Sequence, residues 1–226
     1  MNIGILGTGV VGQAMAGKLA DLGHSVMIGT RDVEKTLAND QPGPYGNPPF
    51  RVWQEQHPQV KLGAFPAAAQ HGELIINATN GAATLAALQA AGEANLAGKV
   101  LIDIANPLDF SQGMPPTLFV CNTDSLAEQI QHAFPQAQVV KTLNTMNANI
   151  MVNPGQLAGG EHTVFVSGND AGAKAQVSDL LRSFGWRDII DLGDIRSARG
   201  AEMLMPVWLS LFGALQSPLI NLHVAR

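Results

Sequence analysis

The chain has 226 residues, of which 46% are hydrophobic and 14% are charged, so it is long enough for one large domain and lacks the composition of a disordered protein. Thirteen Lys and Arg against eighteen Asp and Glu leave a formal net charge of −5, which argues against nucleic acid as a partner. Cys121 is the only cysteine, so the chain can form neither an intrachain disulfide nor a multi-cysteine metal site, and we expect a reducing compartment such as the cytoplasm.

Short apolar runs alternate with helix-like stretches along the chain. The apolar runs predict strands at residues 2–6, 25–28, 60–63, 73–79, 99–105, 138–143, 162–167 and 188–191. The intervening stretches predict helices at residues 10–22, 32–37, 50–56, 67–71, 82–96, 125–133, 171–184 and 197–216, the last kinked at Pro206. We expect loops at residues 39–49 and 145–161, which lack periodicity. This order predicts an α/β fold with a Rossmann-type, doubly wound and mainly parallel sheet.

Two apolar segments, residues 1–30 and 203–224, could be mistaken for targeting or membrane segments. The first has no basic residue before Lys18 and contains repeated glycines, so we interpret it as domain core. The second carries no formal charge, but Pro206, Gly213 and other polar or helix-breaking residues interrupt it. We therefore expect a buried or dimer-facing helix there, and a soluble protein without a membrane partner.

A glycine-rich turn follows the first expected strand. Gly7, Gly9 and Gly12 form the pattern G-x-G-x-x-G between a strand and a helix. In this setting the first glycine permits a tight turn, the second lets the backbone approach a pyrophosphate, and the third lets the helix pack on the strand. A tight turn without a ligand is the alternative. We predict that a dinucleotide contacts this turn through Gly7, Thr8, Gly9, Val10, Val11 and Gly12.

The end of the second expected strand indicates which dinucleotide binds. An acidic residue there would hold the ribose hydroxyls of NAD, whereas an Arg would accommodate the 2′-phosphate of NADP. The chain has Thr30 and Arg31 at this point and Lys35 one helical turn later, which favours NADP. Asp32 is the counterargument, because a shifted strand end would bring its carboxylate to the ribose, but we expect it to cap the next helix.

Small and polar residues follow the other central strands. In doubly wound sheets the ligand lies outside the carboxyl ends of the strands, so these residues are candidates to bind the nicotinamide and its ribose. By themselves they predict only a cleft. The candidates are Ala78, Thr79, Asn80, Ala105, Asn106, Pro107 and Asn144.

Five segments together resemble one known family over nearly the whole chain. They are residues 7–12 (GTGVVG), 29–32 (GTRD), 102–108 (IDIANPL), 139–145 (VVKTLNT) and 197–199 (SAR) with Glu202 and Pro206. The chain resembles the NADP oxidoreductases that use the deazaflavin coenzyme F-420, and it is similar to the cytosolic reductase domain of six-transmembrane metalloreductases. The glycine motif is common to many families, whereas the last two segments are more particular.

The resemblance implies a Rossmann domain at residues 1–147, a small C-terminal α/β extension at residues 148–226, and a homodimer. It also implies hydride transfer between NADPH and a planar ring, coenzyme F-420 or a flavin, stacked on the nicotinamide. Because a hydride passes directly between two rings, we expect no catalytic acid or base and no metal. By resemblance, the walls of the acceptor pocket are Asn144, Thr145, Met146, Asn147, Met203 and Met205.

Two other functions fit the same motifs. A non-catalytic NADP sensor would bind the dinucleotide but would have no acceptor site. A flat pocket at residues 144–147, open to the nicotinamide, would distinguish the reductase from the sensor. An imine or hydroxy-acid reductase would share the cofactor domain, but such proteins usually add a long helical domain.

Two groups of side chains have ordinary structural explanations. The six histidines show no paired metal-ligand spacing, so we expect surface or capping roles for them. Four arginines could hold an anionic substrate tail, but ion pairs with Glu202, Asp191 or Asp194 are the simpler expectation. These arginines are Arg182, Arg187, Arg196 and Arg199.

Overall fold

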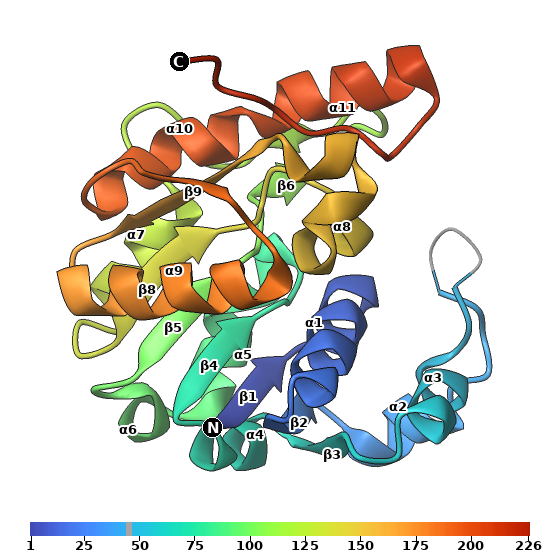
Figure 1. Cartoon of the computed structure of the whole chain (residues 1–226). Helices are drawn as coiled ribbons and strands as arrows, with labels where there is room; N and C mark the ends of the chain where they lie inside the picture. Colours follow the sequence, from blue (N-terminus) through green and yellow to red (C-terminus); the bar gives the residue numbers. More distant parts are fainter. Residues whose placement is uncertain (44–46) are drawn as a thin grey trace.

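The structure is a computed structural model that describes residues 1–43 and 47–226 (Figure 1). Its main sheet has the strand order β10-β9-β8-β5-β4-β1-β2-β3. The eight strands are β1 (Asn2–Leu6), β2 (Ser25–Thr30), β3 (Lys61–Ala64), β4 (Leu74–Asn77), β5 (Val100–Asp103), β8 (Gln138–Thr142), β9 (Thr163–Gly168) and β10 (Asp188–Asp191).

Neighbouring strands from β3 to β8 in this order pair in parallel, while β9 pairs antiparallel to β8 and β10 runs parallel to β9. The predicted doubly wound, mainly parallel sheet is therefore confirmed. Because β9 and β10 join the same sheet, the strands expected in a C-terminal extension continue the core of the preceding residues. The boundary at residue 147 stays a prediction.

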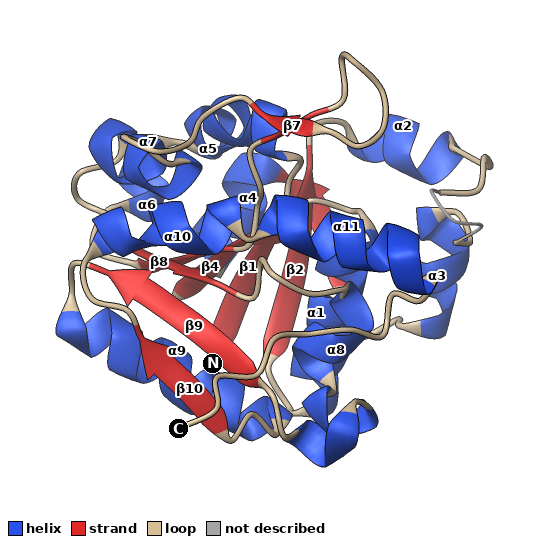
Figure 2. Cartoon of the chain, turned by 90° about the horizontal axis from the view of Figure 1, so that it is seen from above, coloured by secondary structure: helices blue, strands red, loops and turns tan. Residues whose placement is uncertain are grey.

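Helices cover both faces of this sheet (Figure 2). One face packs on α1 (Val10–Asp21), α8 (Ala148–Val152) and α9 (Ala171–Phe184). The other face packs on α4 (Phe65–His71), α5 (Thr84–Ala91), α6 (Glu93–Leu96) and α7 (Leu126–Ala133). In β4, Leu74 and Ile76 belong to the first cluster and Ile75 to the second, so the strand is buried on both sides. This double burial explains the continuous apolar runs in the sequence.

The expected loop at residues 145–161 is wrong in part, because it contains α8 and two short 3-10 helices, η3 (Pro154–Gln156) and η4 (Ala158–Gly160). The side chain of Asn147 caps α8 by accepting hydrogen bonds from the N–H groups of Asn149 and Ile150. The helix buries Ile150, Met151 and Val152 in the core cluster that includes α1. It was missed because so short a helix shows no measurable periodicity.

The expected helix at residues 82–96 is also wrong as a single element. It is divided into η2 (Gly81–Ala83), α5 and α6, and Gly92 separates the last two with a φ of 92°. A positive φ is incompatible with a continuous right-handed helix, and glycine adopts it at low cost. Between β5 and α7, where no element was expected, β6 (Leu108–Asp109) and β7 (Thr117–Leu118) pair antiparallel.

The expected last helix at residues 197–216 is interrupted near Pro206. The segment contains η5 (Ile195–Ser197), α10 (Ala198–Met203) and α11 (Met205–Leu215), with Pro206 in the first turn of α11. Proline is tolerated there because the first helical N–H groups have no intrahelical partner. Over the described residues, no helix combines the length and apolar character needed to cross a membrane.

The remaining expected elements are present with small shifts of their ends, including α2 (Val33–Ala38) and α3 (Phe50–Gln56). Residues 44–46, in the middle of the expected loop at residues 39–49, lie outside the described part of the chain.

Candidate functional site

The glycine turn joins β1 to α1 by close backbone contacts. Gly7 has a φ of 118°, and a Cβ atom there would lie 2.5 Å from the carbonyl oxygen of Ala78. A Cβ atom on Gly12 would clash with the carbonyl oxygen of Gly7, whereas one on Gly9 would meet nothing within 4 Å. The first and third glycines are thus required by packing, and Gly9 leaves space beside the turn. That space is what the close approach of a pyrophosphate needs.

The start of α1 faces this space. Its N-cap residue is Gly9, and no side chain within the described chain caps the helix. The side chain of Gln13 instead donates a hydrogen bond to the carbonyl oxygen of Thr8 at 2.8 Å and so braces the turn. An uncapped helix start with its N–H groups directed outward is a favourable place for an anion.

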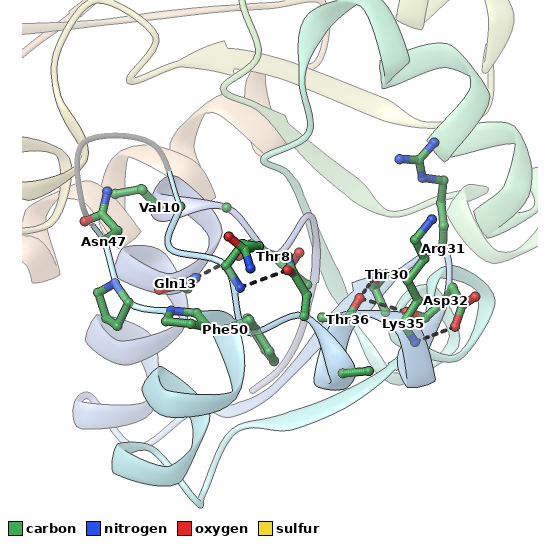
Figure 3. Close-up of a pocket in the computed structure, with 17 residues that line it drawn as sticks. Thr8, Val10, Gln13, Thr30, Arg31, Asp32, Lys35, Thr36, Asn47 and Phe50 are labelled. Atoms are coloured by element: carbon green, nitrogen blue, oxygen red, sulfur yellow. Dashed lines mark hydrogen bonds between the residues drawn. The ribbon is translucent and has the colours of Figure 1, made fainter.

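A cavity of about 900 Å³ opens beside the turn. Its walls come from the glycine turn, from the end of β2 and α2, and from the segment before α3 (Figure 3). Six of its lining residues are among those predicted to contact the dinucleotide, namely Thr8, Gly9, Val10, Thr30, Arg31 and Lys35.

Two cations lie together at one end of this cavity (Figure 3). Arg31 and Lys35 are exposed, and their side chains form no hydrogen bond or ion pair with the described residues. Asp32 caps α2 by accepting from the N–H of Lys35 at 2.9 Å, as expected from the sequence. Thr30 is buried, and its hydroxyl lies 2.8 Å from that of Thr36. The groups available to a ligand phosphate are therefore the two cations.

The opposite wall was not predicted from the sequence. It includes Asn47, Pro48, Pro49 and the largely buried ring of Phe50. Phe50 begins α3 and lies 5.6 Å from Trp53, measured between ring centroids. The sequence feature that could have predicted this apolar wall is an aromatic residue that follows two prolines and begins a helix.

The ends of β4, β5 and β8 lie side by side, as parallel pairing in this order requires. After β5 and β8, Asn106 and Asn144 form a reciprocal pair: each side-chain amide donates to an oxygen of the other residue, at 2.8 and 2.9 Å. Asn144 also donates to the carbonyl oxygen of Ala201 at 3.0 Å. After β4, Asn80 caps η2. The structure thus brings the candidate nicotinamide residues to one edge.

A buried cluster of charges lies beneath this edge. The amine of Lys141 is 2.8 Å from a carboxylate oxygen of Asp103 and 2.9 Å from one of Glu202, and all three side chains are almost fully buried. Burial by itself lowers the pKa of Lys141, but the two carboxylates outweigh this effect and raise the pKa above its usual value. Lys141 is therefore a cation at neutral pH, and its buried ion pairs were not predicted from the sequence.

The residues expected around an acceptor are mostly inside the protein. Asn144, Thr145, Met146 and Met205 are buried, Asn147 caps α8, and Met203 is partly exposed. None of these residues lines the cavity described above. A smaller cavity of about 360 Å³ lies nearby, between η2, β6, β7 and α7, and they do not line it either. The acceptor pocket at these residues stays a prediction.

The arginine pairs differ from those expected. Arg196 pairs with Asp194 as predicted, but Arg199 pairs with Glu128 and Arg182 with Asp179. Glu202 and Asp191 pair with lysines instead, Glu202 with Lys141 and Asp191 with Lys174. Within residues 1–43 and 47–226, no group of three His, Cys, Asp or Glu side chains is arranged to hold a metal.

Comparisons with known proteins agree with this geometry. A family model described as NADP oxidoreductase, coenzyme F-420-dependent, matches residues 2–107. A crystal structure from Arthrobacter sp. FB24, provisionally named as an F-420-dependent NADP reductase, is 63% identical, covers 100% of both chains and superposes with a TM-score of 0.97.

Curated relatives are more distant. The F-420-dependent NADP reductase of Methanothermobacter marburgensis is 27% identical over 93% of this chain and 92% of its own length. Metalloreductase STEAP3 of Rattus norvegicus is 28% identical over 92% of this chain, which spans only 38% of that relative. A reductive aminase from Aspergillus terreus, solved with NADPH and ethyl levulinate, shares the fold with a TM-score of 0.63 at 18% identity.

The different surroundings of Gly9 and Gly12 predict different effects of the same substitution. Gly9→Ala leaves the thermal unfolding transition unchanged but weakens NADPH binding by roughly 10- to 150-fold, the effect of losing one hydrogen bond to a charged group. Gly12→Ala lowers the free energy of unfolding by about 1–3 kcal/mol, because its methyl group must displace the backbone of Gly7. Calorimetric titration and thermal denaturation measure the two effects. Equal destabilisation by both substitutions contradicts the assignment.

Proposed function

Because the chain belongs to the family of NADP oxidoreductases that depend on coenzyme F-420, we propose that it transfers a hydride between NADPH and a planar redox acceptor, coenzyme F-420 or a flavin. The observation that carries the proposal is the glycine turn with two cations, unpaired within the described part of the chain, at the far end of one cavity. This combination matches a pyrophosphate at the turn and the 2′-phosphate of NADP at Arg31 and Lys35.

The described residues fit NADP at its adenosine end. Gly9 leaves open space at the helix start, Arg31 offers a planar fork of donors to a phosphate, and Phe50 provides an apolar wall. Asp32 is already engaged as a helix cap, which removes the main argument for NAD. When bound, NADPH supplies the hydride. The role of these residues is to hold the dinucleotide and set its direction across the sheet edge.

At the other end, the strand ends orient the nicotinamide half. Two hydrogen bonds between Asn106 and Asn144 hold both residues in one conformation. Their backbone and remaining polar groups are therefore fixed in position to bind the carboxamide and ribose of the nicotinamide half. Helices α10 and α11 run across the edge where the parallel strands end (Figure 1). We place the acceptor between this edge and these helices, where stacking and exclusion of water would govern the rate.

Two alternatives make different demands on the site. An imine reductase needs a proton donor for the substrate nitrogen, but the ionisable groups found at this edge, Asp103, Lys141 and Glu202, are buried and paired with one another. The likeness to the reductive aminase supports the fold alone. A non-catalytic NADP sensor would bind NADPH with the same groups but would not oxidise it, whichever acceptor is added.

The acceptor class is tested by following NADPH absorbance with coenzyme F-420, FMN, riboflavin and ferric chelates. We expect oxidation with a planar ring acceptor and with no dependence on added metal. We also expect substitutions of ionisable residues around the cleft to change binding more than turnover. NADPH binding without oxidation by any acceptor would favour the sensor. A single acid or histidine whose loss abolishes turnover with binding intact would favour a carbonyl or imine substrate.

Arg31→Ala is expected to weaken NADPH binding selectively. Loss of one charge-assisted hydrogen bond to the 2′-phosphate corresponds to roughly a 10- to 150-fold loss of affinity. NADH lacks that phosphate, so its affinity should hardly change. Arg182→Ala, which removes an exposed arginine paired with Asp179 on α9, is the matched control. Titrating both dinucleotides decides the matter, and equal losses for NADPH and NADH would assign Arg31 a structural role.

We also propose that the chain forms a homodimer through α11. Only Met205 of this helix is buried, while Val207 is 50%, Leu211 37% and Leu215 59% exposed. Light scattering at micromolar concentration should give twice the monomer mass, and Leu211→Glu should reduce it. Leu22→Glu, at a similarly exposed leucine following α1, is the control and should leave the mass unchanged. A monomeric wild-type protein at this concentration refutes the dimer.

A further inference from the structure

A continuous network of buried polar side chains crosses the ends of three neighbouring strands. At the end of β4, the amide of Asn77 accepts from Thr79 at 2.6 Å and donates to Asp103 at 2.7 Å, at the end of β5. Asp103 binds Lys141 of β8, and Lys141 binds Glu202 of α10. The carboxylate of Glu202 then accepts from the N–H groups of residues 126 and 127, at 2.8 and 3.1 Å, in the first turn of α7.

This network holds one peptide segment from two sides. Asp103 accepts from the N–H of Ala105 at 3.2 Å, and the amine of Lys141 donates to the carbonyl oxygen of Ala105. The next residue, Asn106, is paired with Asn144. The segment of Ala105 and Asn106 lies at the edge that we assign to the nicotinamide half of the cofactor. Lys141 therefore contacts the backbone of that segment directly, through one hydrogen bond.

Stability alone does not account for this arrangement. One cation and two carboxylates in the interior cost desolvation, and well-packed apolar side chains of similar volume often stabilise such a position as well or better. The backbone nearby is also strained: Leu143, two residues after Lys141, is buried and has a φ of 61°, which is unfavourable for leucine. Strain and buried charge at the same strand end are typical of a site whose geometry is held for function.

We infer that Lys141 is a positioning residue that fixes the Ala105–Asn106 segment for the nicotinamide half of NADPH. The inference rests on the proposed function. Lys141 itself is buried and acts through the carbonyl group of Ala105 and through Asp103 and Glu202. Its loss should affect the nicotinamide half of the ligand and leave the adenosine half, at Arg31 and Lys35, in place.

The test compares two ligands: NADPH and 2′-phospho-ADP-ribose, which lacks the nicotinamide. Lys141→Met keeps most of the length of the side chain and removes its charge and its hydrogen-bond donors. We expect it to weaken NADPH binding by about 2- to 30-fold, the range for substitutions that act on a ligand without touching it, while 2′-phospho-ADP-ribose binds as in the wild type. Glu202→Gln removes one carboxylate partner of Lys141 and should weaken NADPH binding by a smaller factor, again leaving 2′-phospho-ADP-ribose binding unchanged.

Lys99→Met is the matched control. Lys99 precedes β5 at the opposite end of that strand and also donates to a backbone carbonyl oxygen, that of Ala69, at 2.7 Å. It should leave both affinities unchanged. Circular dichroism identifies variants that fold, and if Lys141→Met does not fold, Glu202→Gln decides.

Two outcomes overturn the inference: an equal loss for both ligands, which shows a structural role only, and no loss for either ligand in a folded variant. Failure of the wild type to bind NADPH is a different result, because it refutes the proposed function itself.

Discussion

The common direction of six adjacent strands is the constraint on which the rest of the molecule depends. Because β3, β2, β1, β4, β5 and β8 all pair in parallel, every one of their carboxyl ends lies at the same edge of the sheet. Residues far apart in the chain, such as Arg31, Asn106 and Asn144, consequently lie at one edge of the sheet. The crossover helices required by parallel pairing bury both faces, so only the edge remains for binding.

The C-terminal part of the chain is tied to this edge by specific polar contacts. Glu202 of α10 connects Lys141 in the sheet to the first turn of α7, and Asn144 donates to the carbonyl oxygen of Ala201. The partial positive charge at the start of α7 helps to balance the second buried carboxylate. Residues after β8 therefore contribute to the order of the central edge, in addition to extending the sheet through β9 and β10.

The parts of the structure that the sequence predicted are those determined locally. Some features depend only on residues that are close together in the sequence, so their patterns predict them. They are the three glycines between a strand and a helix, the helix cap at Asp32 and the apolar strands. The cluster of Asp103, Lys141 and Glu202 is different, because it forms only when separate elements pack together. Helix α8 was missed because five residues are too few to show a period, and its apolar residues are buried in a core cluster that also includes residues of α1. The wall at Phe50 forms because residues 47–50 line the same cavity as the glycine turn, which is distant from them in the sequence.

The exposed position of Arg31 and Lys35 also bears on how a phosphate-bearing ligand reaches the protein. The chain carries a formal net charge of −5, which repels such a ligand at long range. In physiological salt, however, charges farther away than about 8 Å are largely screened. A ligand near the cavity therefore experiences the charges that line it, Arg31, Lys35 and Asp32, far more than the carboxylates elsewhere on the chain. Because the cations lie at one end of the cavity itself, the site can attract an anionic cofactor although the protein as a whole is acidic. The rest of the surface can therefore remain acidic without preventing binding.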